Sequence, residues 1–479
     1  MKFSIQFNTP ASYKERNTFI FLNQLHQFKN EINWNFQAYG KLWNYNLQYF
    51  NFLHQNDLTN IVKENLLCDI HKWLKKGQLK LEPYPVSLRI MNTIRYLSSS
   101  IEKNNNSIAE DTYAQLNYLY NHLEYHLSGN HLLENAFALL MGGAAFEEHK
   151  WIKKAKSVLY SELDEQILND GGHFELSLMY HQVILFRVLE LIDWYSQSKE
   201  PDLKFLDYVR VKAGVMLNLL KSASFKTGDI PHFNDSAPGI AFTSRELFAF
   251  AQKLSLTEPI IIPLKESGYR KFGNEIYECL LDVGSIAASY QPGHSHSDVF
   301  SFVLYKSTKP FIVDVGTSTY EIGQKRDYER STSAHNTVVV QGQNQSEVWE
   351  SFRVGRRASV KIINESGFHL EAKHNGYYPA FGIYHTRKFE FHKKAIEIED
   401  DIGHINGKLL LHFHPDCELI ESDENNLILI KERASVKFEN TNQVYLKEYE
   451  FAEGFNQYRK AFKVEVDFKS KIKTTIKFL

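Results

Sequence analysis

Two groups of polar residues in this chain have the types and spacing that chemistry requires. The denser group begins with His294 and His296, which a single serine separates, and continues with Asp314 and His335. In a strand, side chains two residues apart point to the same side, and hairpin partners would bring Asp314 and His335 close to them. Two imidazoles and a carboxylate suit a zinc-like ion with one open position. A buried His–Asp hydrogen-bond network is the alternative that the spacing leaves open.

The second group lies in the first half of the chain. Asn130, His131 and Glu134 stand at positions i, i+1 and i+4 near an expected helix start, so Glu134 can share a face with one of the other two. The segment Asp170-Gly171-Gly172 follows, and Tyr180 comes after it. Asn130 could simply cap the helix and Tyr180 could simply fill the core, so the spacing alone does not decide their role.

Hydrophobic periodicity indicates which elements must position these residues. From about residue 12 to about 255 the apolar residues recur at three and four, which predicts many helices of ordinary length. Breaks with turn chemistry at 103–106, 169–172 and 198–201 separate these helices.

After about residue 265 the period changes to two. From 462 to 478 apolar and charged residues alternate, and short β-rich runs occur at 338–340, 396–398 and 427–430. We therefore expect an α+β multidomain chain with a helical domain at 1–262 and an antiparallel β-sandwich at 263–479, joined where Pro259 and Pro263 break helical structure.

Composition excludes several classes of function. Lys and Arg number 55 against 57 Asp and Glu, so there is no overall positive charge to bind nucleic acid, and we expect no such partner. The three cysteines, Cys68, Cys279 and Cys417, lack CxxC spacing, which argues against a disulfide framework. No apolar run approaches the roughly 20 residues of a membrane span. Aromatic residues make up 14% of the chain, which fits either a carbohydrate-binding cleft or an aromatic core.

The N-terminal residues 1–10 show no basic region followed by an apolar run. We therefore expect no secretory signal in this chain and a cytoplasmic location in a bacterium, or a periplasmic or secreted one if a signal was removed.

Taken together, the motifs resemble the heparinase II/III superfamily of polysaccharide lyases, which includes heparinase-like and alginate lyase-like enzymes. In chain order they are Trp43-Asn44-Tyr45-Asn46-Leu47, Glu82 to Arg89, Gly129-Asn130-His131, Asp170-Gly171-Gly172 with Tyr180, Gly293 to Asp298, and Ala334 to Val338. The resemblance implies an N-terminal (α/α) toroid followed by a C-terminal antiparallel β-sandwich. It also implies a carbon–oxygen lyase that cleaves a uronate-containing polysaccharide by β-elimination, leaving a 4,5-unsaturated uronate.

The resemblance also implies roles for individual residues. Asn130 and His131 match the pair that neutralises the substrate carboxylate, and Tyr180 matches the catalytic tyrosine, expected as the acid, with the role of base as well left open. His294 matches the histidine that faces this tyrosine from the sheet domain, and it or His131 is the base for substrates whose C5 proton lies on the other face.

Further residues are expected around these. His296, Asp314 and His335 match a structural site for one divalent metal, zinc first and Mn2+ or Ca2+ as alternatives. The expected substrate contacts are Glu134, Tyr328, Arg330, Trp43, Tyr84 and Arg89.

The sequence departs from the family pattern at Glu175-Leu176-Ser177-Leu178, where relatives tend to have an arginine and a proline. The substrate of any one relative therefore does not carry over to this chain. The resemblance as a whole implies an acidic polysaccharide substrate, with glycosaminoglycans of the hyaluronan, chondroitin or heparan type ahead of alginate-like polymers. A non-catalytic or editing polysaccharide-binding protein of a surface-polysaccharide pathway is one alternative. A glycoside hydrolase that uses two carboxylates such as Asp170 and Glu175 is the other.

Overall fold

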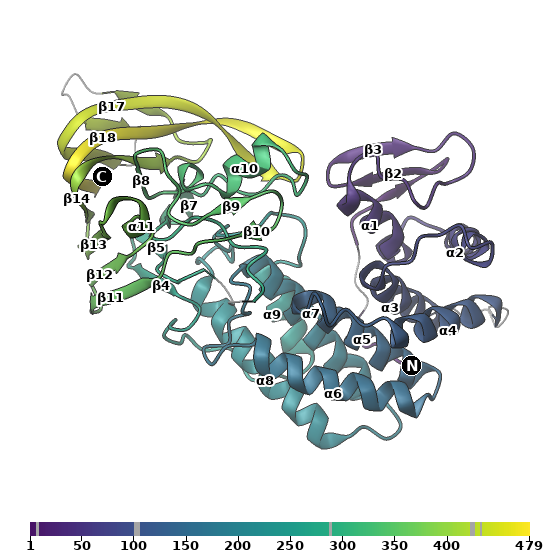
Figure 1. The fold of residues 1–479 in the computed structure, drawn as a ribbon. Coiled ribbons are helices and arrows are strands. Elements are labelled where there is room, and N and C mark those ends of the chain that lie inside the picture. Colours follow the sequence, from purple (N-terminus) through teal and green to yellow (C-terminus); the bar gives the residue numbers. More distant parts are fainter. Residues whose placement is uncertain (6–8, 100–105, 287–289, 422–426, 432–433) are drawn as a thin grey trace. The chain divides into compact units, whose positions relative to one another are not determined.

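A computed structural model describes residues 1–5, 9–99, 106–286, 290–421, 427–431 and 434–479 (Figure 1). Contacts divide the chain into two compact units. The first, which we call the helical unit, contains Met1–Gln166, Ile184–Gly214 and Ala249–Thr257. The second, which we call the sheet unit, contains Ile167–Val183, Val215–Phe248 and Glu258–Leu479. The domain boundary expected between 262 and 263 stays a prediction.

Helices α1 to α9 occupy the first half of the chain, as the periodicity predicts. They are α1 Lys41–Tyr49, the 3-10 turn η1 Asn51–His54, α2 Asn60–Lys75, α3 Pro83–Ser99, α4 Asn106–Asn121, α5 Gly129–Ala145, α6 His149–Gln166, α7 Leu178–Tyr195, α8 Leu203–Ala223 and α9 Ser244–Lys253. None of the helices in the described residues is long and apolar enough to cross a membrane.

Two of the expected breaks between helices are confirmed. Residues 169–172 lie between α6 and α7, and 198–201 lie between α7 and α8. Gly171 has φ +86°, and a β-carbon there would lie 2.1 Å from the Val215 carbonyl oxygen, so the turn requires glycine. Of the third break, residues 103–105 lie outside the described residues and Asn106 begins α4.

The prediction of helix from about residue 12 onward is wrong for residues 13–27, which contain strands. Strands β1 Tyr13–Lys14, β2 Thr18–Phe21 and β3 Gln24–Gln27 form a three-stranded antiparallel sheet. Phe19 and Phe21 are buried on one face of β2 and contribute to an aromatic core with Trp34 and Trp43. An alternation over only four residues is too short to stand out against the helical period around it.

In the sheet unit, strands follow one another in antiparallel order and form two main sheets, as the C-terminal alternation predicts. The four-stranded sheet contains β4 Tyr269–Gly273, β5 Tyr277–Asp282, β6 Phe302–Lys306 and β7 Lys309–Ile312. The nine-stranded sheet contains β8 Val338–Val340, β11 Val360–Glu365, β12 His369–His374, β13 His385–Phe391, β14 Ala395–His412, β15 Leu419–Glu421, β16 Leu427–Ile430, β17 Ala434–Gly454 and β18 Gln457–Phe478. Smaller elements are α10 Gln324–Arg330, η2 Thr332–Ala334, α11 Tyr378–Phe381 and the hairpin of β9 Val348–Trp349 with β10 Arg353–Val354.

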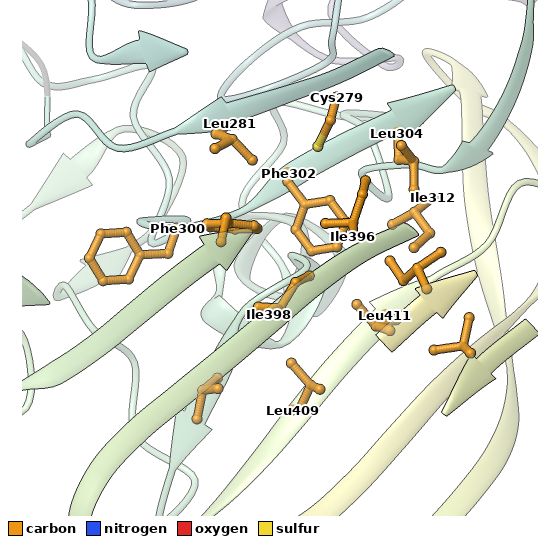
Figure 2. Packing of buried hydrophobic residues seen from close by; sticks show 14 of the residues in the cluster. Cys279, Leu281, Phe300, Phe302, Leu304, Ile312, Ile396, Ile398, Leu409 and Leu411 are labelled. Atoms are coloured by element: carbon orange, nitrogen blue, oxygen red, sulfur yellow. The ribbon is translucent and has the colours of Figure 1, made fainter. Parts of the chain in front are cut away.

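The two sheets share one hydrophobic core. In Figure 2, Phe302 of the small sheet lies among side chains of the large sheet such as Ile396 and Ile398. Along β18, Val464, Val466 and the other apolar residues of the alternation are buried, apart from Phe462, which is 39% exposed. The α+β class, with helices first and antiparallel sheets after them, is confirmed.

A chain of buried hydrogen bonds crosses three strands of the large sheet. The Gly376 N–H donates to Nδ1 of His374 at 3.0 Å, so the Nε2–H of His374 donates to Nδ1 of His385 at 3.0 Å. His385 then donates from Nε2 to Asp400 at 2.6 Å, and Arg387 also binds Asp400. Both histidines are fully buried and neutral in this arrangement, and burial lowers the pKa of each, that of His374 well below its ordinary value.

Stability should therefore fall on acidification. Below about pH 6.5 the unfolded chain takes up protons that folded His374 and His385 do not accept, so stability present above that pH is lost as the pH falls. Between about pH 6.5 and 5.5, the free energy of unfolding of the double variant His374→Gln/His385→Gln should fall by about 2 kcal/mol less than that of the parent, measured by urea unfolding. The exposed His404→Gln should retain the parent's pH dependence. If the free energy of unfolding depended on pH equally in the parent and the double variant, this would contradict the neutral state of His374 and His385.

Candidate active site

A buried carboxylate, that of Asp235, holds both histidines of the 293–298 segment. Its Oδ2 accepts from Nδ1 of His294 at 2.9 Å, and its Oδ1 accepts from Nε2 of His296 at 2.9 Å. Arg326 of α10 completes the arrangement by donating to both oxygens, with 2.7 Å to Oδ2. The histidines share a face as predicted, but they lie in a loop rather than in a strand, and a carboxylate from another segment aligns them.

Hydrogen bonds of the Asn234 side chain and of the Asp235 backbone position the loop that carries Asp235. Asn234 has φ +55°, and its side chain donates to the Leu176 carbonyl and accepts from the His296 N–H. The Asp235 N–H donates to the His294 carbonyl at 3.0 Å. Sequence reasoning missed Asp235 because it lies 59 residues from His294 in a segment with no periodic signal.

Tyr180, in the first turn of α7, lies beside His294. The two ring centroids are 4.1 Å apart, and the Tyr180 hydroxyl is 3.2 Å from the Tyr320 hydroxyl. The prediction that Tyr180 and His294 come together is therefore confirmed by this geometry within the sheet unit. Tyr320 was not predicted, because it lies seven residues before the segment from 327 to 330 that the sequence singled out.

Burial and neighbouring charges shift the pKa of Asp235 and the pKa of Tyr180 in opposite directions. Burial by itself would raise the pKa of the Asp235 carboxyl, but Arg326 and the hydrogen bonds from His294 and His296 hold it well below its ordinary value. Burial raises the pKa of Tyr180 well above 10, and Tyr320 and Asp235 raise it further. Because an ionised Asp235 accepts from Nδ1 of His294, the hydrogen sits on Nδ1 and the Nε2 lone pair is available to accept a proton.

The two expected substrate contacts in α10 need correction. Arg330 is fully buried and donates to the backbone carbonyls of Ser295, Trp349 and Glu350, so no guanidinium is left for a substrate. Tyr328 packs into a small hydrophobic cluster, and its hydroxyl is buried without a hydrogen-bond partner in the structure. Both residues support the site rather than face it.

The predicted metal ligands form hydrogen-bonded pairs. Nδ1 of His335 lies 2.7 Å from Asp314, while His296 is paired with Asp235, and the rings of the two histidines are 5.4 Å apart. Each histidine keeps one buried ring nitrogen without a partner, Nδ1 of His296 and Nε2 of His335. These atoms are suitable metal donors, but the described residues contain no group of three or more ligating side chains placed to hold an ion. The arrangement as it stands is the buried His–Asp network, and we derive no step through a metal.

In the helical unit, His131 is the accessible member of its group. Its side chain is 28% exposed, its Nδ1 lies 3.1 Å from Glu124, and its ring stacks on Tyr84 with centroids 4.2 Å apart. Asn130 precedes it in the first turn of α5 and is 3% exposed. Tyr84 thus contacts one predicted catalytic residue directly.

The structure places the side chains of three further expected substrate contacts in buried positions, where each already has partners within the protein. Trp43 is fully buried in the aromatic core. Arg89 is fully buried and donates to Gln115 and Gln48. Glu134 is 1% exposed and accepts from Arg187 at 2.8 and 3.0 Å, which makes it part of an ionic network.

The two carboxylates considered for hydrolysis are also engaged. Asp170 accepts hydrogen bonds from the backbone of Lys265 and from Ser267 at 2.8 to 3.0 Å, which fixes the glycine turn. Glu175 is 2% exposed and lies 3.9 Å from Nδ1 of His173. Neither carboxylate has the exposure that attack on a glycosidic bond requires.

Comparison with solved structures shows what fold this is. The chain is similar to the crystal structure of heparinase III, with a TM-score of 0.74 and 17% identity over 95% of this chain and 80% of that one. It is also similar to a mutant of heparan sulfate lyase HepC from Pedobacter heparinus, with a TM-score of 0.64 and 18% identity over 97% of this chain and 81% of that one. A chondroitin AC lyase from Streptomyces coelicolor A3 gives a TM-score of 0.53 at 8% identity over 92% and 74%.

Sequence comparison identifies relatives with a recorded activity. A heparin-sulfate lyase from Bacteroides stercoris is 24% identical over 337 residues, which are 63% of this chain and 48% of that protein. One from Pedobacter heparinus is 25% identical over 333 residues, 62% of this chain and 48% of that protein. The chain thus spans about half the length of the curated relatives it matches.

Two family models match in chain order. The model described as heparinase II/III N-terminus matches residues 81–254, and the model described as heparinase II/III-like, C-terminal matches residues 258–479. The resemblance that the sequence motifs indicated is confirmed, and the chain belongs to the heparinase II/III family.

Proposed function

We propose that this protein is a lyase that cleaves a uronate-containing glycosaminoglycan by β-elimination, with heparan sulfate as the first candidate substrate. The observation that carries the proposal is the contact between Tyr180 and His294, which brings a proton donor and a proton acceptor together. The names of the relatives, heparin-sulfate lyases, favour heparan sulfate over hyaluronan, chondroitin and alginate.

The site supports the following sequence of proton transfers. Nε2 of His294 accepts the C5 proton of the uronate while Asp235 stabilises the imidazolium that results. The C5 electron pair forms the C4–C5 double bond, the C4–O4 bond breaks, and the Tyr180 hydroxyl gives its proton to O4. The imidazolium then returns a proton to the tyrosinate, so the cycle consumes no water.

The raised pKa of Tyr180 favours the role of acid over that of base. A hydroxyl that stays protonated at neutral pH is a donor for an alkoxide-like leaving group. Tyr320, whose hydroxyl lies next to it, would hold the orientation of that group. Asn130 and His131 remain the proposed residues that neutralise the uronate carboxylate.

We further propose that the sheet unit binds one divalent ion, zinc first, at His296, Asp314 and His335, with the unpaired ring nitrogens of the two histidines as donors. Imidazole nitrogens are ligands that zinc prefers, and a bound ion would supply structural support. The ion's role would be to fix the loop that also carries His294.

Incubation with heparan sulfate should yield products with the near-ultraviolet absorbance of an unsaturated uronate. Tyr180→Phe should lower the rate by roughly 10²- to 10⁴-fold, because it removes the proposed acid and little else. The exposed Tyr378→Phe is the matched control and should retain full activity. A Tyr180→Phe variant as active as the parent would contradict the assignment.

The mass of the products separates the proposed function from its alternatives. Elimination yields fragments whose masses sum to that of the substrate, whereas hydrolysis adds one water for each cleavage. We expect no added water. Absence of cleavage across heparan sulfate, chondroitin, hyaluronan and alginate, together with retained binding, would instead favour a polysaccharide-binding protein.

Metal content tests the proposed ion. His296→Ala should lower the bound zinc, measured by mass spectrometry of the purified protein, and should lower the melting temperature at the same time. His369→Ala is the control, because His369 is also nearly buried but pairs with Glu390 in β12 and β13. It should lose stability without losing metal. Zinc that is absent from the parent would contradict the proposal.

A further inference from the structure

The hairpin of β9 and β10 places an aromatic ring against the proposed catalytic histidine. Phe352, in the turn, has its ring centroid 5.6 Å from that of His294 and 5.3 Å from that of Tyr320. The ring is nevertheless 43% exposed. The hairpin therefore adjoins the candidate site and faces solvent.

Two buried arginines hold the hairpin in this position. Arg326 donates to the Ser351 carbonyl at 2.8 and 3.1 Å, and Arg330 donates to the carbonyls of Trp349 and Glu350 at 3.3 and 3.2 Å. Arg326 also binds Asp235, and Arg330 also donates to the Ser295 carbonyl at 3.0 Å. The turn is thus tied to the loop that carries His294, and Figure 1 shows α10 beside β9 and β10.

Two side chains of the hairpin share a face next to Phe352. Trp349 and Arg353 stand directly opposite each other in the antiparallel pair, so they project to the same side. Trp349 is 43% exposed, and the Arg353 side chain is 71% exposed. Of the six tryptophans, all of which lie in the described residues, Trp349 alone is exposed to this degree.

Among the residues that the structure describes, neither the Trp349 nor the Arg353 side chain makes a hydrogen bond or a close ion pair. The indole lies against Gly355, where a β-carbon would come within 3.1 Å of it, so a glycine there leaves room for the flat ring. The nearest carboxylate to Arg353 is Glu350 at 3.7 Å, and both side chains are exposed, so this pair contributes little. An exposed indole beside an available guanidinium is the combination that recognises an anionic sugar.

We propose that Trp349 and Arg353 form a second carbohydrate contact, which holds a sugar residue adjacent to the one cleaved. The indole would stack on the apolar face of the sugar ring, and the guanidinium would bind its carboxylate or sulfate group through two parallel hydrogen bonds. This inference rests on the proposed function for the identity of the polymer. It adds a determinant of substrate affinity that is separate from the proton transfers.

The test uses Trp349→Ala and Arg353→Ala, made in the full chain. Binding of heparan sulfate is measured by calorimetry in the Tyr180→Phe background, where turnover does not interfere, and KM and kcat are measured in the active background. Each change should weaken binding and raise KM by about 10-fold, with kcat changed by less than about 2-fold, because neither residue contacts the reacting atoms.

Salt dependence distinguishes the two contacts. Arg353→Ala should reduce the loss of affinity that added salt causes, because it removes an ionic contact, whereas Trp349→Ala should leave that dependence unchanged. Phe368→Ala, 65% exposed, and Lys460→Ala, 82% exposed, are matched controls on the same unit and should bind like the parent. Uncharged dextran is the control probe, and it should not bind.

The outcomes separate this inference from the proposed function. Cleavage of heparan sulfate with unchanged affinity and KM in both variants would overturn the hairpin contact while the lyase stands. Weakened binding in both variants without cleavage by the parent would support the hairpin contact while the lyase fails. No binding of heparan sulfate by the parent would overturn the inference.

Discussion

The candidate site depends on the ionised carboxylate of Asp235, which is held where no water reaches it. A charge in such a place must be compensated, and Arg326 and two imidazole N–H groups provide the compensation. The same contacts determine which nitrogen of His294 carries the hydrogen and how α10 sits against the histidine loop. Removal of the charge would therefore disturb geometry and proton chemistry together.

In the sheet unit, the hydrophobic core and the candidate site occupy different parts of the structure. The core is apolar and continuous, and it fixes the ends of β7 and β8. Asp314 follows β7, and His335 precedes β8, so both residues lie in loops next to the ends of strands. The proposed catalytic residues stand outside the sheets, at a helix start and in loops, where side chains can meet a substrate. Arg330 satisfies the loop carbonyls of Ser295 and Glu350, so a buried cation takes the place of a strand partner there.

The helical unit uses its polar residues mainly for stability. Glu134, Arg187, Glu190 and Arg95 form a buried ionic network, in which each guanidinium contacts at least one carboxylate. Such a network tolerates no single deletion well, because the remaining partner would be left charged and buried. His131 differs in being partly exposed between Glu124 and Tyr84, which agrees with its proposed role in binding the uronate carboxylate.

The sequence by itself determined the class of the fold, the family and half of the candidate site. Apolar residues recur every three to four positions in a helix such as α7 and every two positions in a strand such as β18. These spacings show which face of each element is buried, and they can be read from the local sequence. The motifs around Tyr180 and His294 indicated the proposed acid and base, because residue types and their spacing can be read directly from the sequence. The burial of an individual side chain cannot be read from the sequence, so Trp43, Arg89 and Arg330 were expected to contact a substrate although packing encloses them.

Only the tertiary structure decided which distant groups meet. Asp235 and Arg326 come from two segments that no local pattern links, and their pairing follows from the requirement that a buried charge find a partner in space. The same holds for the exposed pair Trp349 and Arg353, since exposure is a property of the packed chain. Sequence thus determined the elements and the reactive types, and packing decided their partners, because electrostatic and hydrogen-bond compensation acts through space rather than along the backbone.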